Sequence, residues 1–124
     1  MSSIKKAPES NHIGSRVNPV TGCPLTAALS AIGGKWKLII VYWLAESPKH
    51  FAGLRHAIPG ISQKVLTQQL RELVSDGLVT RQPQGPVPAP VEYSLSEYGR
   101  SVLPLVEEVR VWGRTHLERD QSSS

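Results

Sequence analysis

The sequence has a single cysteine and no long apolar run, and these two absences exclude several classes of protein. Because Cys23 is the one cysteine among 124 residues, an intramolecular disulfide and a multi-cysteine metal site are both excluded. No apolar stretch reaches the roughly 20 residues that a membrane-spanning helix needs, and none resembles a signal peptide. We therefore expect a cytoplasmic protein, not bound to a membrane, whose cysteine is a free thiol.

Residue patterns typical of catalysis are also missing. The sequence contains no Ser/His/Asp arrangement, no phosphate-binding glycine loop and no suitably spaced pair of acids. A thiol-dependent catalyst built on Cys23 would lack both an evident base and a resolving cysteine. The histidines do not have the spacing of metal ligands; they are His12, His50, His56 and His116. We expect no enzymatic activity, no metal and no cofactor.

The charge balance and the polar ends of the chain indicate one small basic domain. Lysine and arginine number 14 against 10 acidic residues, a net charge of +4, which favours a polyanionic partner. Residues 1–22 are polar and contain Pro8, Gly14 and Pro19, so we expect a flexible, mildly basic arm. Residues 119–124 are expected to be a disordered tail, which leaves 23–118 as the folded domain.

The most informative stretch is 61–77, which predicts an amphipathic helix over 62–76. Ser62 is suited to the N-cap, and Gly77 to the left-handed residue that ends a helix. Apolar residues recur at helical spacing on one side: Val65, Leu66, Leu70, Leu73 and Val74. The outward side carries amide, hydroxyl and cationic groups and no acid: Gln63, Lys64, Thr67, Gln68 and Arg71. These side chains are the types that pair with base edges and phosphates, although a solvated helix face has the same composition.

The residues before this stretch predict three further helices. Cys23 is the expected N-cap of a short helix that begins at Pro24 and extends to Ile32, because proline is tolerated in a first turn. A helix from Lys35 to about Glu46 is apolar nearly all round and should be the buried centre. After a short extended piece at 49–50, a third helix with Phe51, Leu54 and Ile58 inward precedes the turn at 59–60. The third helix, the turn and the helix over 62–76 form a helix-turn-helix.

The residues after it predict a wing and a terminal helix. Residues 78–81 and 91–95 are β-prone and flank a Pro/Gly-rich loop, so they should form a hairpin. A single long helix should follow from Ser96, as N-cap, to about Glu118, with a kink at Pro104. It carries an apolar seam that should pair with a second copy, formed by Val102, Leu105, Val109 and Trp112. The expected fold is mainly α with a small β-hairpin: a winged helix-turn-helix domain with terminal dimerisation helices.

Motifs spread through the chain resemble those of one family. From Cys23 to about Leu117 the sequence is similar to the HxlR family of bacterial winged-helix transcriptional regulators. The matching motifs are Cys23-Pro24-Leu25, Ile32-Gly33-Gly34-Lys35-Trp36, Phe51-x-x-Leu54-Arg55, Ile58-Pro59-Gly60-Ile61-Ser62, Leu66-Thr67-Gln68-Gln69-Leu70-Arg71-Glu72-Leu73, Asp76-Gly77-Leu78-Val79, Val91-Glu92-Tyr93-Ser94-Leu95-Ser96, Gly99-Arg100 and Trp112-Gly113. Each fragment alone is weak, but their order and spacing together are specific.

The resemblance implies a homodimer that binds a palindromic operator in double-stranded DNA and acts as a repressor or an activator. In this family the terminal helices form the dimer interface, and the two recognition helices enter successive major grooves. The wing often carries an arginine just before the Val-Glu-Tyr strand, where this chain has Pro90. Arg81, with Gln82 and Gln84 nearby, is therefore the candidate for wing contacts. A winged-helix protein-interaction module without specific DNA binding is the alternative function.

A subset of the family responds to oxidants or electrophiles through a cysteine at the start of the first helix, the position of Cys23 here. The implied inducer is an oxidant, a quinone or an aldehyde. A helix N-terminus favours the thiolate, and so the reactive form of this side chain. The other interpretation is that Cys23 is a structural N-cap that never reacts.

Overall fold

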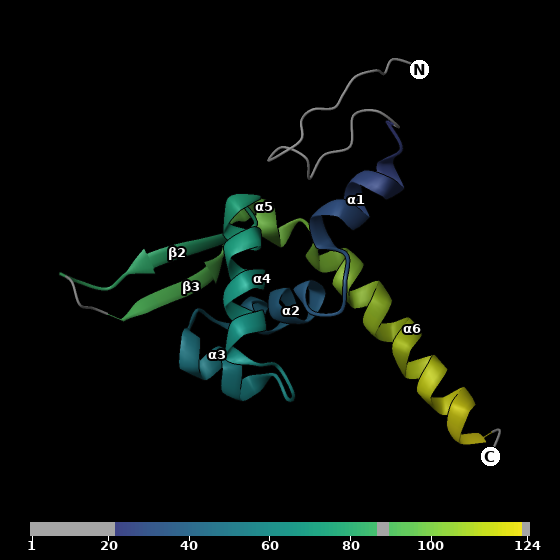
Figure 1. Ribbon diagram of the computed structural model, residues 1–124. Helices are drawn as coiled ribbons and strands as arrows, with labels where there is room; N and C mark the ends of the chain where they lie inside the picture. The colour runs from purple at the N-terminus through teal and green to yellow at the C-terminus, as the bar shows by residue number, and fades with distance from the viewer. Residues whose placement is uncertain (1–21, 87–89, 123–124) are drawn as a thin grey trace.

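The computed structural model describes residues 22–86 and 90–122, which form a mostly helical body with a small antiparallel sheet (Figure 1). This arrangement confirms the predicted fold class. The elements, in chain order, are α1 (Pro24–Ile32), α2 (Lys37–Glu46), β1 (Lys49–His50), α3 (Phe51–Ala57), α4 (Gln63–Ser75), β2 (Val79–Pro83), β3 (Val91–Leu95), α5 (Glu97–Arg100) and α6 (Leu103–Ser122).

Helix α2 is the centre of the core, as its apolar sequence predicts. Ile40, Val41 and Leu44 are at most 1% exposed, and the helix contacts α3, α6 and β3. The helix begins at Lys37 rather than at Lys35, because Gly34 adopts a left-handed φ of +89° and the chain bends before the first helical turn. Among the described residues no single helix is long and apolar enough to cross a membrane, and the α1–α2 pair is bent by 70° at its junction.

Helices α3 and α4 form the predicted helix-turn-helix. Gly60, with φ of +84°, makes the turn between them, a conformation that an L side chain rarely adopts. Helix α4 buries Leu66, Leu70 and Leu73 against the core. Its end also follows the prediction, because Gly77 has a φ of +81° directly after the last turn.

The sheet has one more strand than the predicted hairpin. Its order is β1–β3–β2, with every pair antiparallel, and Arg81 lies opposite Tyr93 in the β2–β3 ladder. The extended piece at 49–50 is β1, which pairs His50 with Glu92 of β3. In Figure 1 the β2–β3 hairpin projects from one side of the body, away from the C-terminal end of α6.

The predicted single helix from Ser96 to Glu118 is wrong, because the chain turns between two helices. Ser96 does cap a helix, its Oγ accepting from the amide of Gly99 at 2.8 Å, but this helix, α5, ends at Arg100. Helix α6 starts after a turn at 101–102, so Pro104 lies in its first turn and needs no kink.

The predicted C-terminal tail is partly wrong as well. Helix α6 continues to Ser122, which places 119–122 in the helix rather than in a disordered tail. Residues 1–21 of the predicted arm and 123–124 of the predicted tail lie outside the described residues. Helix α6 packs on α2 through Val106, and its later turns extend away from the body (Figure 1).

Candidate nucleic-acid interface

Helix α4 presents its polar side to solvent at the surface of the helix-turn-helix. Ser62 caps it as predicted, since the Ser62 Oγ accepts from the amide of Val65 at 3.1 Å. Leucines on the other side hold the helix on the core, so the outward side is fixed. The structure exposes every predicted side chain on this helix: Ser62, Gln63, Lys64, Thr67, Gln68 and Arg71. This polar side offers donors, acceptors and two cations to a polyanion.

Two residues that sequence reasoning missed lie beneath this surface. Lys37 of α2 is only 5% exposed, and its Nζ lies 2.7 Å from Oε1 of Glu72. The other carboxylate oxygen of Glu72 accepts from Nε2 of Gln68, also at 2.7 Å. The i,i+4 spacing of Gln68 and Glu72 was a visible signal for the second contact. The first depends on how α2 and α4 pack, which no local pattern reports.

The wing lies beside the same surface. Arg81 is exposed on β2, and Nδ1 of His50 lies 3.1 Å from the carbonyl oxygen of Val91, which ties β1 to the start of β3. A groove of about 420 Å³ separates α4 from the wing. It is lined by His50, Phe51, Ala52, Gln63, Thr67, Pro90, Val91 and Tyr93. Two of the predicted α4 residues, Gln63 and Thr67, therefore lie across this groove from the wing, whereas Arg81 does not line the groove.

Cys23 lies at the other end of the described chain, at the N-terminus of α1. It is the N-cap residue, and its side chain is exposed. The pKa of the Cys23 thiol is lowered, first by hydrogen bonding to the Thr26 side chain and then by the backbone amides of Thr26 and Leu25. An exposed thiol with a lowered pKa has the properties of a reactive cysteine rather than an inert buried one.

Helices α1 and α6 carry large apolar side chains that the described chain leaves exposed. On α6, Trp112 is 66% exposed, and Leu105 and Val109 are more than two-fifths exposed. Val102 is half-buried between α5 and α6, so three of the four predicted seam residues are open to a partner. Sequence reasoning missed Leu25 and Leu29 of α1, which are also exposed; their helical spacing was the available signal.

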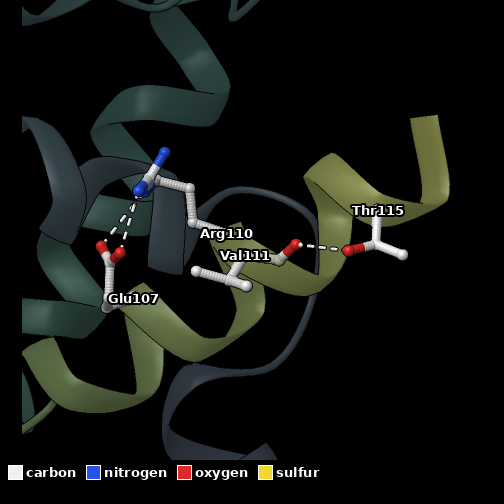
Figure 2. A network of polar contacts seen from close by, with 4 residues as sticks. All are labelled: Glu107, Arg110, Val111 and Thr115. Carbon is white, nitrogen blue, oxygen red and sulfur yellow. Dashed lines mark hydrogen bonds and ion pairs between the residues drawn. The ribbon is translucent and has the colours of Figure 1, made fainter. Parts of the chain in front are cut away.

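Polar contacts link successive turns of α6 beside this seam, between Glu107 and Arg110 and between Val111 and Thr115 (Figure 2). Arg110 binds both carboxylate oxygens of Glu107, with Nη2 and Oε2 2.8 Å apart. This hydrogen bonding lowers the pKa of Glu107 and raises that of Arg110. Arg110 also lines a groove of about 410 Å³ between α2 and α6, with Leu38, Ile39, Tyr42, Val106 and Val109.

Comparison with known proteins connects these features to a family. The model of the HxlR-like helix-turn-helix family matches residues 31–121. YybR of Bacillus subtilis, an HTH-type transcriptional regulator, is 45% identical over 97 residues, which cover 78% of each chain.

Two solved structures are similar as well. The redox regulator HypR in its oxidised form is 45% identical, with a TM-score of 0.71 over 75% of this chain and 96% of that one. The reduced form of the transcriptional regulator YodB of B. subtilis is 35% identical, with a TM-score of 0.64 over 73% of this chain and 89% of that one. The protein described here therefore belongs to the HxlR-like helix-turn-helix family of transcriptional regulators.

Proposed function

We propose that the protein is a homodimer that reads a palindromic operator by placing two copies of α4 in successive major grooves. The observation that carries the proposal is the outward side of α4, where amides, hydroxyls and two cations are exposed on a helix that the core holds firmly. Amides and guanidinium groups are the side chains that pair bidentately with adenine and guanine edges. Arg81 on the wing would add a backbone or minor-groove contact.

The exposed apolar side chains of α1 and α6 support the dimer. Trp112, Val109 and Leu105 follow one another at three- and four-residue spacing on α6, so a second α6 could bury all three. A two-fold dimer would then hold two copies of α4 at a fixed separation, which is how half-site spacing is read.

Cys23 is the proposed sensor of an oxidant or electrophile. HypR, which this chain resembles, is a redox regulator. Because the chain has one cysteine, oxidation would join Cys23 thiols of two subunits or join one to a small thiol. In either case two thiols lose two protons and two electrons to the oxidant and form one disulfide. With a quinone or an aldehyde, the Cys23 thiolate would instead form an S–C bond to a ring carbon or to the carbonyl carbon. The π bond opens onto oxygen, which takes up a proton from water.

Fluorescence anisotropy with the promoter upstream of the protein's own coding sequence tests DNA reading. We expect tighter binding to this duplex than to a shuffled duplex of the same composition. Arg71→Ala should weaken operator binding, whereas Arg119→Ala, which removes the same charge from the far end of α6, should leave it within about twofold. Equal affinity for operator and shuffled DNA would contradict the proposal and favour a protein-interaction module.

A further inference from the structure

We propose that Glu72 is a positioning residue for base reading: it fixes the side-chain amide of Gln68 in one orientation, and Lys37 fixes Glu72. The inference rests on the proposed function, since it concerns how α4 presents one side chain to DNA. The three residues connect the buried start of α2 to the exposed side of α4.

Glu72 is held from two sides. Its side chain is 24% exposed, and one carboxylate oxygen lies 2.7 Å from the Lys37 Nζ while the other accepts from the Gln68 Nε2 at 2.7 Å. Gln68 itself is exposed and lies one turn earlier on α4. The carboxylate therefore joins a buried cation to a side chain that faces solvent.

Lys37 holds this carboxylate in place through the ion pair between its Nζ and Oε1 of Glu72. Its side chain is 7% exposed, and it lies in the first turn of α2, where the helix dipole disfavours a cation. Helix α2 has no acidic residue in that turn, so the compensating charge comes from Glu72 on another helix. A buried ammonium requires such a partner. The side-chain conformation of Glu72 is therefore set by the packing of α2 against α4.

The Glu72 carboxylate in turn selects one orientation of the Gln68 amide. A carboxylate only accepts hydrogen bonds, so the amide nitrogen must face Glu72, and the flipped amide would place two oxygens together. One N–H is used in this contact. The second N–H and Oε1 remain for DNA, and these are the two groups that pair with N7 and the N6 amine of adenine. These two groups of Gln68 are therefore already oriented in the free protein.

The test compares base discrimination in four proteins: wild type, Gln68→Ala, the double variant Lys37→Met with Glu72→Gln, and the triple variant. The double variant removes the buried charge together with its partner, so no ammonium is left unpaired. Glutamine at 72 offers both a donor and an acceptor, so it no longer selects one amide orientation. The operator is first selected by the wild type from random duplexes, and the position that loses discrimination in Gln68→Ala is taken as the base pair that Gln68 reads.

We expect the double variant to lose about tenfold in discrimination at that base pair only, and to bind random duplexes within about twofold of the wild type. In the Gln68→Ala background the same two changes should have no further effect on discrimination. Unchanged discrimination in a folded double variant, or an equal loss at every position, would overturn the inference. Gln68→Ala with wild-type discrimination would also overturn it while leaving the proposed function intact, whereas a wild type that selects no sequence would overturn both.

If the double variant does not fold, the side-chain amide resonances of Gln68 in the free wild-type protein decide the question. A proton held on a carboxylate should resonate downfield of a solvated amide proton and exchange more slowly with water. Shifts and exchange rates equal to those of solvated glutamines would overturn the inference.

Discussion

At the scale of single residues, the chemistry of Cys23 depends on its position at the start of α1. Hydrogen bonds from Thr26 and Leu25 favour the thiolate and lower the thiol pKa in the folded chain. The unfolded chain lacks these contacts. Between the lowered pKa of the folded thiol and the ordinary thiol pKa, the folded protein therefore carries more thiolate than the unfolded one. The difference disappears at lower pH, where both are protonated, and at higher pH, where both are ionised.

This difference predicts the pH dependence of alkylation. The rate of reaction of Cys23 with iodoacetamide should reach half of its plateau at a lower pH in the native protein than in the same protein in urea. Thr26→Val, which removes the hydroxyl but keeps the shape, should move the native profile toward the unfolded one. Superimposable native and urea profiles would show that the helix terminus does not activate the thiol.

The same thiol is the basis of a prediction about signalling. Cys23→Ser should keep operator affinity within about twofold, because serine is also a good N-cap, and should lose any response to diamide, quinone or aldehyde. The response requires that the modified dimer prefer a different geometry, since an adduct that fits both geometries equally shifts nothing. Release of DNA by treated Cys23→Ser would assign the signal to another part of the protein.

Lys64 should differ from the base-reading side chains in the kind of binding it supports. As an exposed cation near the start of α4, it is placed for a phosphate contact, which carries no sequence information. Lys64→Ala should weaken binding to operator and random DNA by the same factor. In a dimer it should also reduce the slope of log affinity against log salt by about 2. A loss confined to the operator would make Lys64 a base reader instead.

At the scale of elements, α5 fixes how the wing meets the start of the terminal helix. Ser96 donates its hydroxyl to the carbonyl of Gly77 at 2.6 Å, and its amide donates to the carbonyl of Leu78 at 3.1 Å. Gly99 is buried in this contact, and a Cβ there would clash with the Leu78 carbonyl oxygen. The turn that follows α4, at 77–78, and the start of α5 are therefore packed backbone to backbone.

Gly99→Ala should destabilise the fold by about 1–3 kcal/mol, because the carbonyl of Leu78 cannot move without breaking its hydrogen bond to Ser96. Gly113→Ala is the matched control, since Gly113 lies in α6 with no atom within 4 Å of an added Cβ. It should be neutral or stabilising by up to about 1 kcal/mol. Urea unfolding of both variants measures the difference, and equal midpoints would show that the contact between Gly99 and Leu78 yields without cost.

The helices whose ends the sequence alone predicts are those with a capping serine, a proline in the first turn or a glycine after the last turn. Ser62 and Gly77 mark both ends of α4, and Pro24 marks the start of α1. The break between α5 and α6 has one such mark, Pro104 in the first turn of α6, but apolar residues continue at Val102 and Leu103, so the pattern predicts one helix with a kink. Likewise, the contact of Lys37 with Glu72 joins residues 35 positions apart, so it arises from the packing of α2 on α4 and not from any periodicity.

At the scale of the whole molecule, the surfaces that we propose for DNA reading and for dimerisation lie apart. Gln63 and Thr67 of α4 line the groove beside the wing. In Figure 1 the wing projects from one side of the body and the later turns of α6 extend from another. A second copy bound along α6 would leave α4 uncovered. This separation allows one chain to contact its partner and DNA at the same time.

Trp112 is the largest exposed apolar side chain of α6. It is 66% exposed and stacks on His116, with the two ring centroids 5.1 Å apart, so it is open to a partner. If it anchors the interface, Trp112→Ala should weaken the dimer by about 2–4 kcal/mol. Operator affinity should fall at least about tenfold with it, because two half-sites must be held at once.

Glu118→Ala, about 120° around the same helix, should change neither property. Sedimentation and anisotropy at matched concentrations measure both, and a Trp112→Ala protein that stays dimeric at nanomolar concentration would place the interface elsewhere.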